Sequence, residues 1–183
     1  MADRLAANFD RAVEASLRAA GGDDPEARIQ TYLADAHAIE AQSIELLEKA
    51  PGMTKDSDLA QVFLRHLEET RAQQALVRDR LEGAGGGPSA LKDAVMRFGG
   101  LNLGGFFAAQ PDTPAKLAGF AFAFEHLEIA AYELLKRVSL KAGDEDTAAM
   151  AGRIAGEERA AAEAIRGQFE PAVASALEAQ GVG

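Results

Sequence analysis

The most constraining feature of this sequence is a pair of glutamates inside a strongly apolar segment, FAFEHLEIAAYELL, at residues 122–135. Glu125 and Glu128 are three residues apart, so on a helix they lie one turn apart on the same face. A buried carboxylate without a partner costs several kcal/mol, so it takes up a proton, pairs with another group or binds a metal ion. The fold must therefore expose these two glutamates to water or hold them inside the protein.

Helical periodicity runs through the rest of the chain, and no run shows the alternating β-branched pattern of strands. Breaks at glycine and proline separate the expected helices, which cover residues 2–19, 25–50, 56–83, 89–98, 114–142, 144–168 and 171–180. Four of them are long, and a longer connection separates the second long helix from the third. This order predicts an all-α, ferritin-like four-helix bundle with a crossover between the second and third bundle helices.

The length of 183 residues fits one compact domain. We expect a single ferritin-like domain over 1–183, with a leading helix in 1–22, a bundle core in 25–168 and a tail helix in 171–183. The segment FGGLNLGGFF at 98–107 either forms an exposed apolar patch for self-association or packs over the end of the bundle.

Charge and cysteine content exclude several classes of function. The formal net charge of −10 repels nucleic-acid phosphate and anionic lipid, so we expect neither nucleic acid nor a membrane as a partner. The absence of cysteine excludes disulfides, thiolate metal sites and thiol nucleophiles, and it is compatible with a reducing cytoplasm. The N-terminal segment has no signal-peptide pattern, and no apolar run approaches the roughly 20 residues of a membrane span. We therefore expect a cytoplasmic protein.

Each long helix carries a carboxylate near its middle, on or beside its apolar stripe. Glu40 lies in the stripe of the helix 25–50, Glu125 and Glu128 in that of 114–142, and Glu158 in that of 144–168. The helix 56–83 is less regular. Its expected buried row is Leu59, Phe63, Leu67, Thr70, Gln74, Val77 and Leu81. His66, Glu69 and Gln73 lie along one shoulder of that row, and Glu68 points away from it.

Carboxylates from all four helices are what a bundle needs for a carboxylate-bridged dimetal site. Carboxylates suit Mn and Fe(II), and an imidazole adds preference for transition metals. Two cations would offset the repulsion among four or five buried carboxylates. Alternatively, a glutamate at the edge of a stripe is a solvated flank, which is common on helices.

The histidines and the central tyrosine also have two interpretations each. His37 and His66 precede a glutamate by three residues, which fits either metal ligation or a surface His–Glu pair. His126 lies beside the acidic row, so it is exposed or contacts a ligand from outside. Tyr132 either hydrogen-bonds a ligand carboxylate or is a core tyrosine with a satisfied hydroxyl.

Several of these motifs resemble segments of a known family. HLEETRAQ at 66–73, FEHLEIAAYELL at 124–135 and GEERAA at 156–161 resemble, in order, segments of the YciE/YciF-type family of bacterial ferritin-like proteins linked to stress responses. AIEAQ at 38–42 resembles the first-helix segment of that family. The resemblance covers about residues 27–167.

The resemblance implies a rubrerythrin-like bundle, a homodimer and a dinuclear metal site, without defining a reaction. The family's acidic positions match Glu40, Glu69, Glu125, Glu128 and Glu158. Its polar positions in the second helix match His66, a further possible ligand, and Gln73, and its third-helix tyrosine matches Tyr132; Gln73 and Tyr132 are expected to support the ligands. Two positions depart from the family: His37 replaces a tyrosine, and Ala162 stands where an Asp is common. Ala162 puts one metal position in doubt.

Three functions follow from these patterns. The first is a ferritin-like protein with two Fe or Mn ions, stress-related, with oxidase or peroxidase chemistry on O2 or peroxide. The second is a non-catalytic stress or interaction protein whose metal site is degenerate or empty. The third is a bundle whose glutamates are solvated in a polar channel.

Overall fold

The structure is a computed structural model that describes residues 25–87 and 113–181. The helices in these two ranges are α2 (Pro25–Lys49), the short 3-10 helix η1 (Ala50–Met53), α3 (Ser57–Gly83), α6 (Thr113–Ala142), α7 (Glu145–Arg166) and α8 (Phe169–Ala179). No strand occurs in the described ranges, which confirms the all-α prediction there. The expected helices over 2–19 and 89–98, and the segment 98–107, lie outside the described residues.

Local sequence determines where the long helices begin and end. The Asp56 carboxylate accepts hydrogen bonds from the backbone N–H groups of Asp58 and Leu59, at 2.9 and 3.1 Å, and so caps α3. Asp144 caps α7 in the same way through the N–H of Thr147, at 3.0 Å. Gly143 ends the preceding helix with a φ of +77°, a conformation that glycine adopts at little cost. The short last helix begins at Phe169, two residues before the expected start at Pro171.

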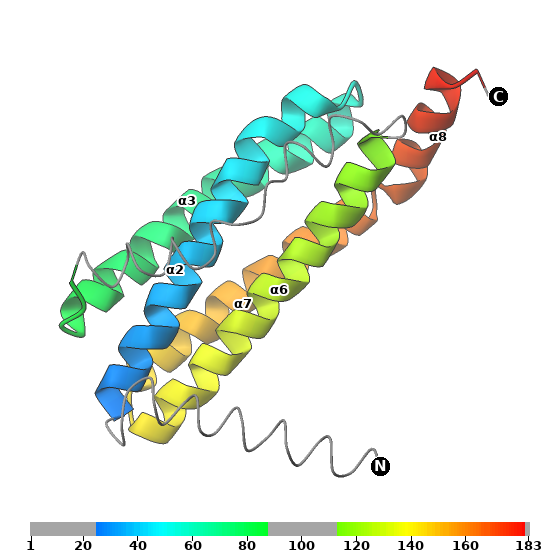
Figure 1. The fold of residues 1–183 in the computed structure, drawn as a ribbon. Helices are drawn as coiled ribbons and strands as arrows, with labels where there is room; N and C mark the ends of the chain where they lie inside the picture. Colours follow the sequence, from blue (N-terminus) through cyan, green and yellow to red (C-terminus); the bar gives the residue numbers. More distant parts are fainter. Residues whose placement is uncertain (1–24, 88–112, 182–183) are drawn as a thin grey trace, which may run out of the picture.

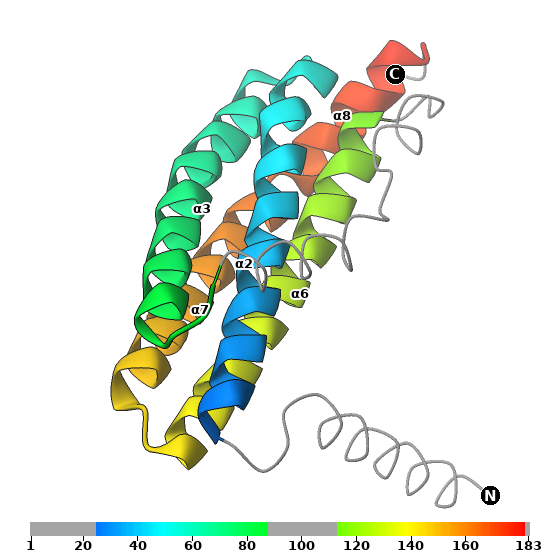
Figure 2. The same cartoon turned by 60° about the vertical axis from the view of Figure 1, so that its left-hand side comes forward.

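The four long helices form a bundle of two antiparallel pairs (Figure 1). α2 runs against α3, and α6 runs against α7, while α3 and α6 run in the same direction (Figure 2). α8 continues beyond the end of α7 and packs against α6. None of the described helices is both long and apolar enough to cross a membrane.

The interior has an apolar cluster towards each end and a polar layer between them. One cluster includes Leu47, Phe63, Leu117 and Ile165, and the other includes Leu33, Leu81, Leu135 and Ile154. The layer consists of buried polar and charged residues: Glu40, Ser43, His66, Thr70, Gln73, Glu125, Glu128 and Glu158. Ser139 and Thr147 are also buried but lie outside the layer. The carboxylates that the sequence placed in apolar stripes therefore face the inside of the bundle.

The buried face of α3 differs from the expected one. Gln73 is 1% exposed and His66 is 3% exposed, whereas Gln74 is only half-buried. The expected row had placed Gln74 at the centre and His66 and Gln73 on a shoulder, and that part of the prediction is wrong. The physical reason is that His66 contacts carboxylates of the polar layer, whereas Gln73 donates a hydrogen bond to Glu157 on α7. Glu68 is exposed, as predicted.

Candidate metal centre

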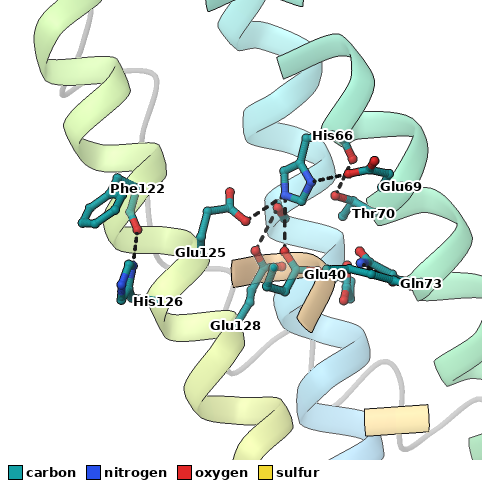
Figure 3. Close-up of polar contacts among 12 residues, drawn as sticks. Glu40, His66, Glu69, Thr70, Gln73, Phe122, Glu125, His126 and Glu128 are labelled. Carbon is teal, nitrogen blue, oxygen red and sulfur yellow. Dashed lines mark hydrogen bonds and ion pairs between the residues drawn. The ribbon is translucent and has the colours of Figure 1, made fainter. Parts of the chain in front are cut away.

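The polar layer is built around the imidazole of His66, which α3 presents to carboxylates of two other helices (Figure 3). Its Nε2 lies 2.8 Å from Glu125 Oε2 on α6 and 3.4 Å from Glu158 Oε2 on α7. Its Nδ1 lies 3.4 Å from Glu69 Oε2 on the solvent side. The hydroxyl of Thr70 donates to the backbone carbonyl of His66 at 2.8 Å, one turn along the same helix. The imidazole therefore bridges an exposed carboxylate and two buried ones.

Four buried side chains converge closely enough to share one cation. His66, Glu125, Glu128 and Glu158 each offer one ligand atom, and these atoms all lie within 4.8 Å of one another. They come from α3, α6 and α7, so the group joins three of the four bundle helices. Each of these residues is at most 3% exposed. An imidazole with several carboxylates is a donor set that Fe, Mn and Zn accept.

The same group holds polar atoms without an aligned hydrogen-bond partner among the described residues. They are His66 Nε2, Glu125 Oε2, Glu128 Oε1 and both carboxylate oxygens of Glu158. The 2.8 Å contact between His66 Nε2 and Glu125 Oε2 is thus a close approach without hydrogen-bond alignment. Buried polar atoms are nearly always paired in folded proteins, and a cluster of this kind could be paired by ordered water or by an ion. A cation at their common centre would satisfy them together.

Glu40 and Ser43 complete the layer from α2. The phenol of Tyr132 donates to Glu40 Oε1, while Glu40 Oε2 is buried without a partner among the described residues. The hydroxyl of Ser43 donates to Glu128 Oε2 at 3.3 Å. Glu40 is fully buried but lies outside the group of four. In both Glu40 and Glu128, therefore, one carboxylate oxygen accepts a hydrogen bond from a hydroxyl, and the other has no hydrogen-bond partner among the described residues.

Burial and mutual repulsion shift the ionisation of the layer towards neutral carboxyl groups. Burial raises the pKa of Glu40 to about 8, against the opposing hydrogen bond from Tyr132. Burial, followed by the neighbouring Glu125, raises the pKa of Glu158 to about 10. Burial and the charge of Glu40 likewise raise the pKa of Glu128 well above its usual value. Without a cation, the layer therefore holds protons at neutral pH.

The pKa of the His66 imidazole is also raised, and for a histidine this favours the charged form. Burial by itself would lower the pKa of His66, but the carboxylates of Glu125 and Glu69 outweigh burial, so the pKa is raised. The metal-free site thus favours a positive imidazolium among carboxyl groups. Tyr132 stays neutral, because burial and Glu40 raise the pKa of its phenol well above the usual value.

The remaining predicted residues lie at the margin of the layer or outside it. The Glu69 side chain is 59% exposed and contacts His66 from outside. His37 is half-buried, and burial followed by the charge of Arg78 lowers its pKa. His126 is exposed on the opposite side of α6, with Nδ1 2.9 Å from the Phe122 carbonyl oxygen (Figure 3).

Ala162 is 2% exposed, so the position where an Asp was expected faces the interior with a methyl group.

The sequence patterns did not identify Glu157 as part of the surroundings of the site. Its carboxylate accepts a hydrogen bond of 3.0 Å from Nε2 of the buried Gln73. Glu157 precedes Glu158, so helical geometry turns it about 100° away from the buried row. Only the position of Gln73 on the neighbouring helix brings it into contact with the layer.

The chain is similar to proteins of known structure and matches one family model. One solved structure, of a protein from Xanthomonas campestris pv. campestris, is 27% identical and has a TM-score of 0.69; the alignment covers 86% of this chain and 98% of that one. YcfI from Rhodopseudomonas palustris is 24% identical with a TM-score of 0.60, over 79% of this chain and 94% of its own, and shares the fold. No curated protein matches the chain. A family model described as a domain of unknown function, DUF892, matches residues 27–178, and the chain therefore belongs to the DUF892 family.

Proposed function

We propose that this protein is a ferritin-like metal-binding protein with a carboxylate-bridged Fe or Mn centre inside its helical bundle. The observation that carries the proposal is the buried group His66, Glu125, Glu128 and Glu158, whose ligand atoms lie within 4.8 Å of one another. The unpaired oxygens of this group support it, because a cation would neutralise the charge and fill the missing coordination. The group of four contains no sulfur ligand, which suits the harder cations.

The donor set is large enough for two ions. His66, Glu125, Glu128 and Glu158 supply one group of donors, and Glu40 adds a fifth buried side chain with a free oxygen. Carboxylates bridge metals well because their two oxygens bind different ions. The buried methyl of Ala162 leaves one inward position without a donor, so we expect the two ions to bind with unequal affinity.

The protein's own residues would hold and orient the ions rather than carry the electrons. Tyr132 and Ser43 each fix one carboxylate oxygen, which orients the other oxygen of Glu40 and of Glu128. Glu69 contacts Nδ1 of His66 and so favours the orientation in which Nε2 faces the interior. The direct ligand role predicted for Glu69 stays a prediction. Bound Fe or Mn would supply redox chemistry towards O2 or peroxide.

The wider predictions belong to the same proposal. The parallel course of α3 and α6 is what a ferritin-like crossover between the second and third bundle helices would produce (Figure 1). A stress-related role in the cytoplasm, a homodimer, and O2 or peroxide as substrate follow from the resemblance to YciE/YciF-type proteins. The net charge of −10 supports the absence of nucleic acid and membrane partners.

A second function, a non-catalytic bundle with a degenerate site, is favoured by one observation, the methyl group of Ala162 at an inward position. Replacing Ala162 with Asp distinguishes the two functions. If the native site is degenerate, the native chain binds fewer than two metal ions per protein and A162D gains an ion. If it is complete, the native stoichiometry is already two.

The central experiment is metal analysis of protein purified without chelators, with anomalous scattering at the Fe and Mn edges. We expect bound metal within the group of four, and its loss in the double variant Glu125→Gln/Glu128→Gln. The control is Glu163→Gln, because Glu163 is exposed on α7 and pairs with Arg166 at 2.6 Å. Metal-free native protein that binds neither Fe(II) nor Mn(II) at neutral pH would contradict the proposal.

A further inference from the structure

The backbones of α3 and α7 approach each other less closely than those of the other three neighbouring helix pairs. α6 packs closely along α7 and α2 along α3, and α2 also lies along α6, whereas α3 and α7 touch over a short stretch. We name the line along which α3 and α7 face each other the α3–α7 seam. Both His66 and Gln73 reach the polar layer from α3, and Glu158 reaches it from α7, so the layer lies directly behind this seam.

Gln73 connects the surface of the α3–α7 seam with the buried layer. Its side chain is 1% exposed, and its Nε2 donates to Glu157 Oε2 at 3.0 Å. Its Oε1 is buried without a hydrogen-bond partner among the described residues. Glu157 directly precedes Glu158 in α7, so the Gln73 amide bonds to the residue beside a buried carboxylate of the layer.

Glu157 is the outer carboxylate of this arrangement. Its side chain is 45% exposed, and its contact with Arg153 Nε is long, at 3.9 Å. Burial is the main cause of the raised pKa of Glu40, and the negative charge of Glu157 adds a smaller contribution. A carboxylate of this kind offers an oxygen ligand to a hydrated cation at the surface and lies one side chain away from buried ligands.

We propose that Glu157 and Gln73 form a port for divalent cations in the α3–α7 seam. Glu157 attracts and first binds the hydrated ion, and the unpaired Oε1 of Gln73 offers it an oxygen on the way to Glu158. This inference rests on the proposed metal centre, and it adds the route by which that centre is filled. Local negative charge near a binding site raises the rate of cation association, and salt weakens this effect by screening the charge.

A purely structural role for the Gln73–Glu157 hydrogen bond makes a different prediction. Glu157→Gln keeps a carbonyl oxygen that accepts from Gln73 Nε2, but it removes the charge. Glu157→Ala removes both the charge and the acceptor. If the bond only ties α3 to α7, Glu157→Gln behaves like the native chain and Glu157→Ala loses stability. If Glu157 is a port, both variants take up metal slowly.

The test measures the rate at which the metal-free full chain takes up Co(II), followed by the visible absorption of bound Co(II) in stopped-flow mixing. We expect Glu157→Gln to slow uptake roughly tenfold at low salt, with the final stoichiometry and the melting temperature unchanged. The difference from the native chain should shrink at about 0.5 M salt, where charges are screened beyond a few ångströms. Glu163→Gln is the matched control, because it removes another exposed carboxylate charge from the same helix, outside the α3–α7 seam, and its rate should stay native.

Three results would overturn the port. Native uptake by Glu157→Gln, with or without a defect in Glu157→Ala, shows that the charge has no part in uptake. Equal slowing by Glu163→Gln shows an effect of net charge alone. Native protein that takes up no Co(II), Fe(II) or Mn(II) overturns the port and the metal centre together, whereas the first two results leave the metal centre intact.

Discussion

Tyr132 and Glu40 are 92 positions apart in the chain, and the phenol of one donates a hydrogen bond to the carboxylate of the other inside the bundle. The bond joins α6 to α2 and fixes one oxygen of a fully buried glutamate. The pKa of Glu40 is still raised to about 8, because burial outweighs the hydrogen bond. The phenol therefore holds this carboxyl in place without making it readily ionised.

Removing the phenol hydroxyl should destabilise the metal-free protein. Tyr132→Phe leaves Glu40 Oε1 buried without its donor, and an unsatisfied buried group costs about 1–3 kcal/mol. Urea unfolding monitored by circular dichroism measures the change in free energy of unfolding. Tyr32→Phe, at the second of the two tyrosines, is the control, because Tyr32 is only partly buried and lies outside the polar layer. Equal stability of the two variants would show that the hydroxyl of Tyr132 contributes nothing.

The stability of the metal-free protein should fall as pH rises from about 5 to about 9. The folded-state pKa values of Glu40 and Glu158 are raised to about 8 and about 10, so between about 4.5 and these values the folded chain binds more protons than the unfolded chain. The raised pKa of His66 acts in the same direction, because its stabilising charge is lost at higher pH. Melting temperatures measured with a chelator present should therefore decrease through this range. A flat or rising profile would contradict the burial of these groups.

A bound cation should reverse much of this loss at neutral and higher pH. A ligand at about 100 times its Kd stabilises a protein by about 2.7 kcal/mol, which corresponds to a rise in Tm of roughly 5–10 °C for a chain of this size. We expect Mn(II) or Fe(II) to raise the Tm of the native chain, with a larger effect at pH 8 than at about pH 6, because protons compete for the ligands. Glu128→Gln, which removes a buried ligand charge, should abolish most of the rise. An equal rise in this variant would place the cation elsewhere.

Glu69 should affect metal affinity through His66. Its carboxylate is 3.4 Å from His66 Nδ1, and loss of such a partner costs roughly 10–100-fold in affinity for a histidine-bound metal. Competition titration with a coloured chelator measures the change for Glu69→Gln. Glu68→Gln is the matched control, because its side chain is 75% exposed and pairs with Arg71 on the surface. Native affinity in Glu69→Gln would exclude both an orienting and a direct ligand role.

The cap of α7 gives a prediction that is independent of metal. Asp144 accepts hydrogen bonds from the backbone N–H and side-chain hydroxyl of Thr147 and pairs with Arg80 of α3. Asp144→Ala should destabilise the protein by about 1–2 kcal/mol, a usual cost for loss of an N-cap. Asp146→Ala, in the same first turn but exposed, should change stability little. Chemical denaturation of the two variants side by side measures the difference.

Periodicity was sufficient to predict the inward carboxylates but not every inward residue of α3. Glu40, Glu125, Glu128 and Glu158 are buried because their helices have long regular apolar stripes on which a 100° step per residue leaves little choice. On α3 the stripe is mixed, and a shift of one residue decides between Gln73 and Gln74. That choice depends on which carboxylates of α6 and α7 face the helix, and a single sequence does not contain this information.

Contacts between side chains of different helices could not be predicted from spacing. The hydrogen bond between Gln73 and Glu157 joins residues 84 positions apart, and Glu157 has the sequence context of an ordinary surface glutamate. His126 shows the opposite case. It lies in the most informative motif of the sequence, yet it is exposed, and Phe122, one turn earlier on the same helix, contacts it through its backbone carbonyl. Proximity to a motif in sequence was thus a weaker guide than position on the helix.

The polar layer between two apolar clusters also determines how the helices align along the bundle. If α3 moved by one helical turn relative to α6 and α7, His66 would leave Glu125 and Glu158 and enter an apolar cluster. The imidazole would then lose its ion-pair contacts with two carboxyl groups and be buried among apolar side chains, at a cost far above that of moving one leucine past another. The residues proposed to bind metal therefore act as a register lock, which permits one longitudinal arrangement of the helices even before a cation binds.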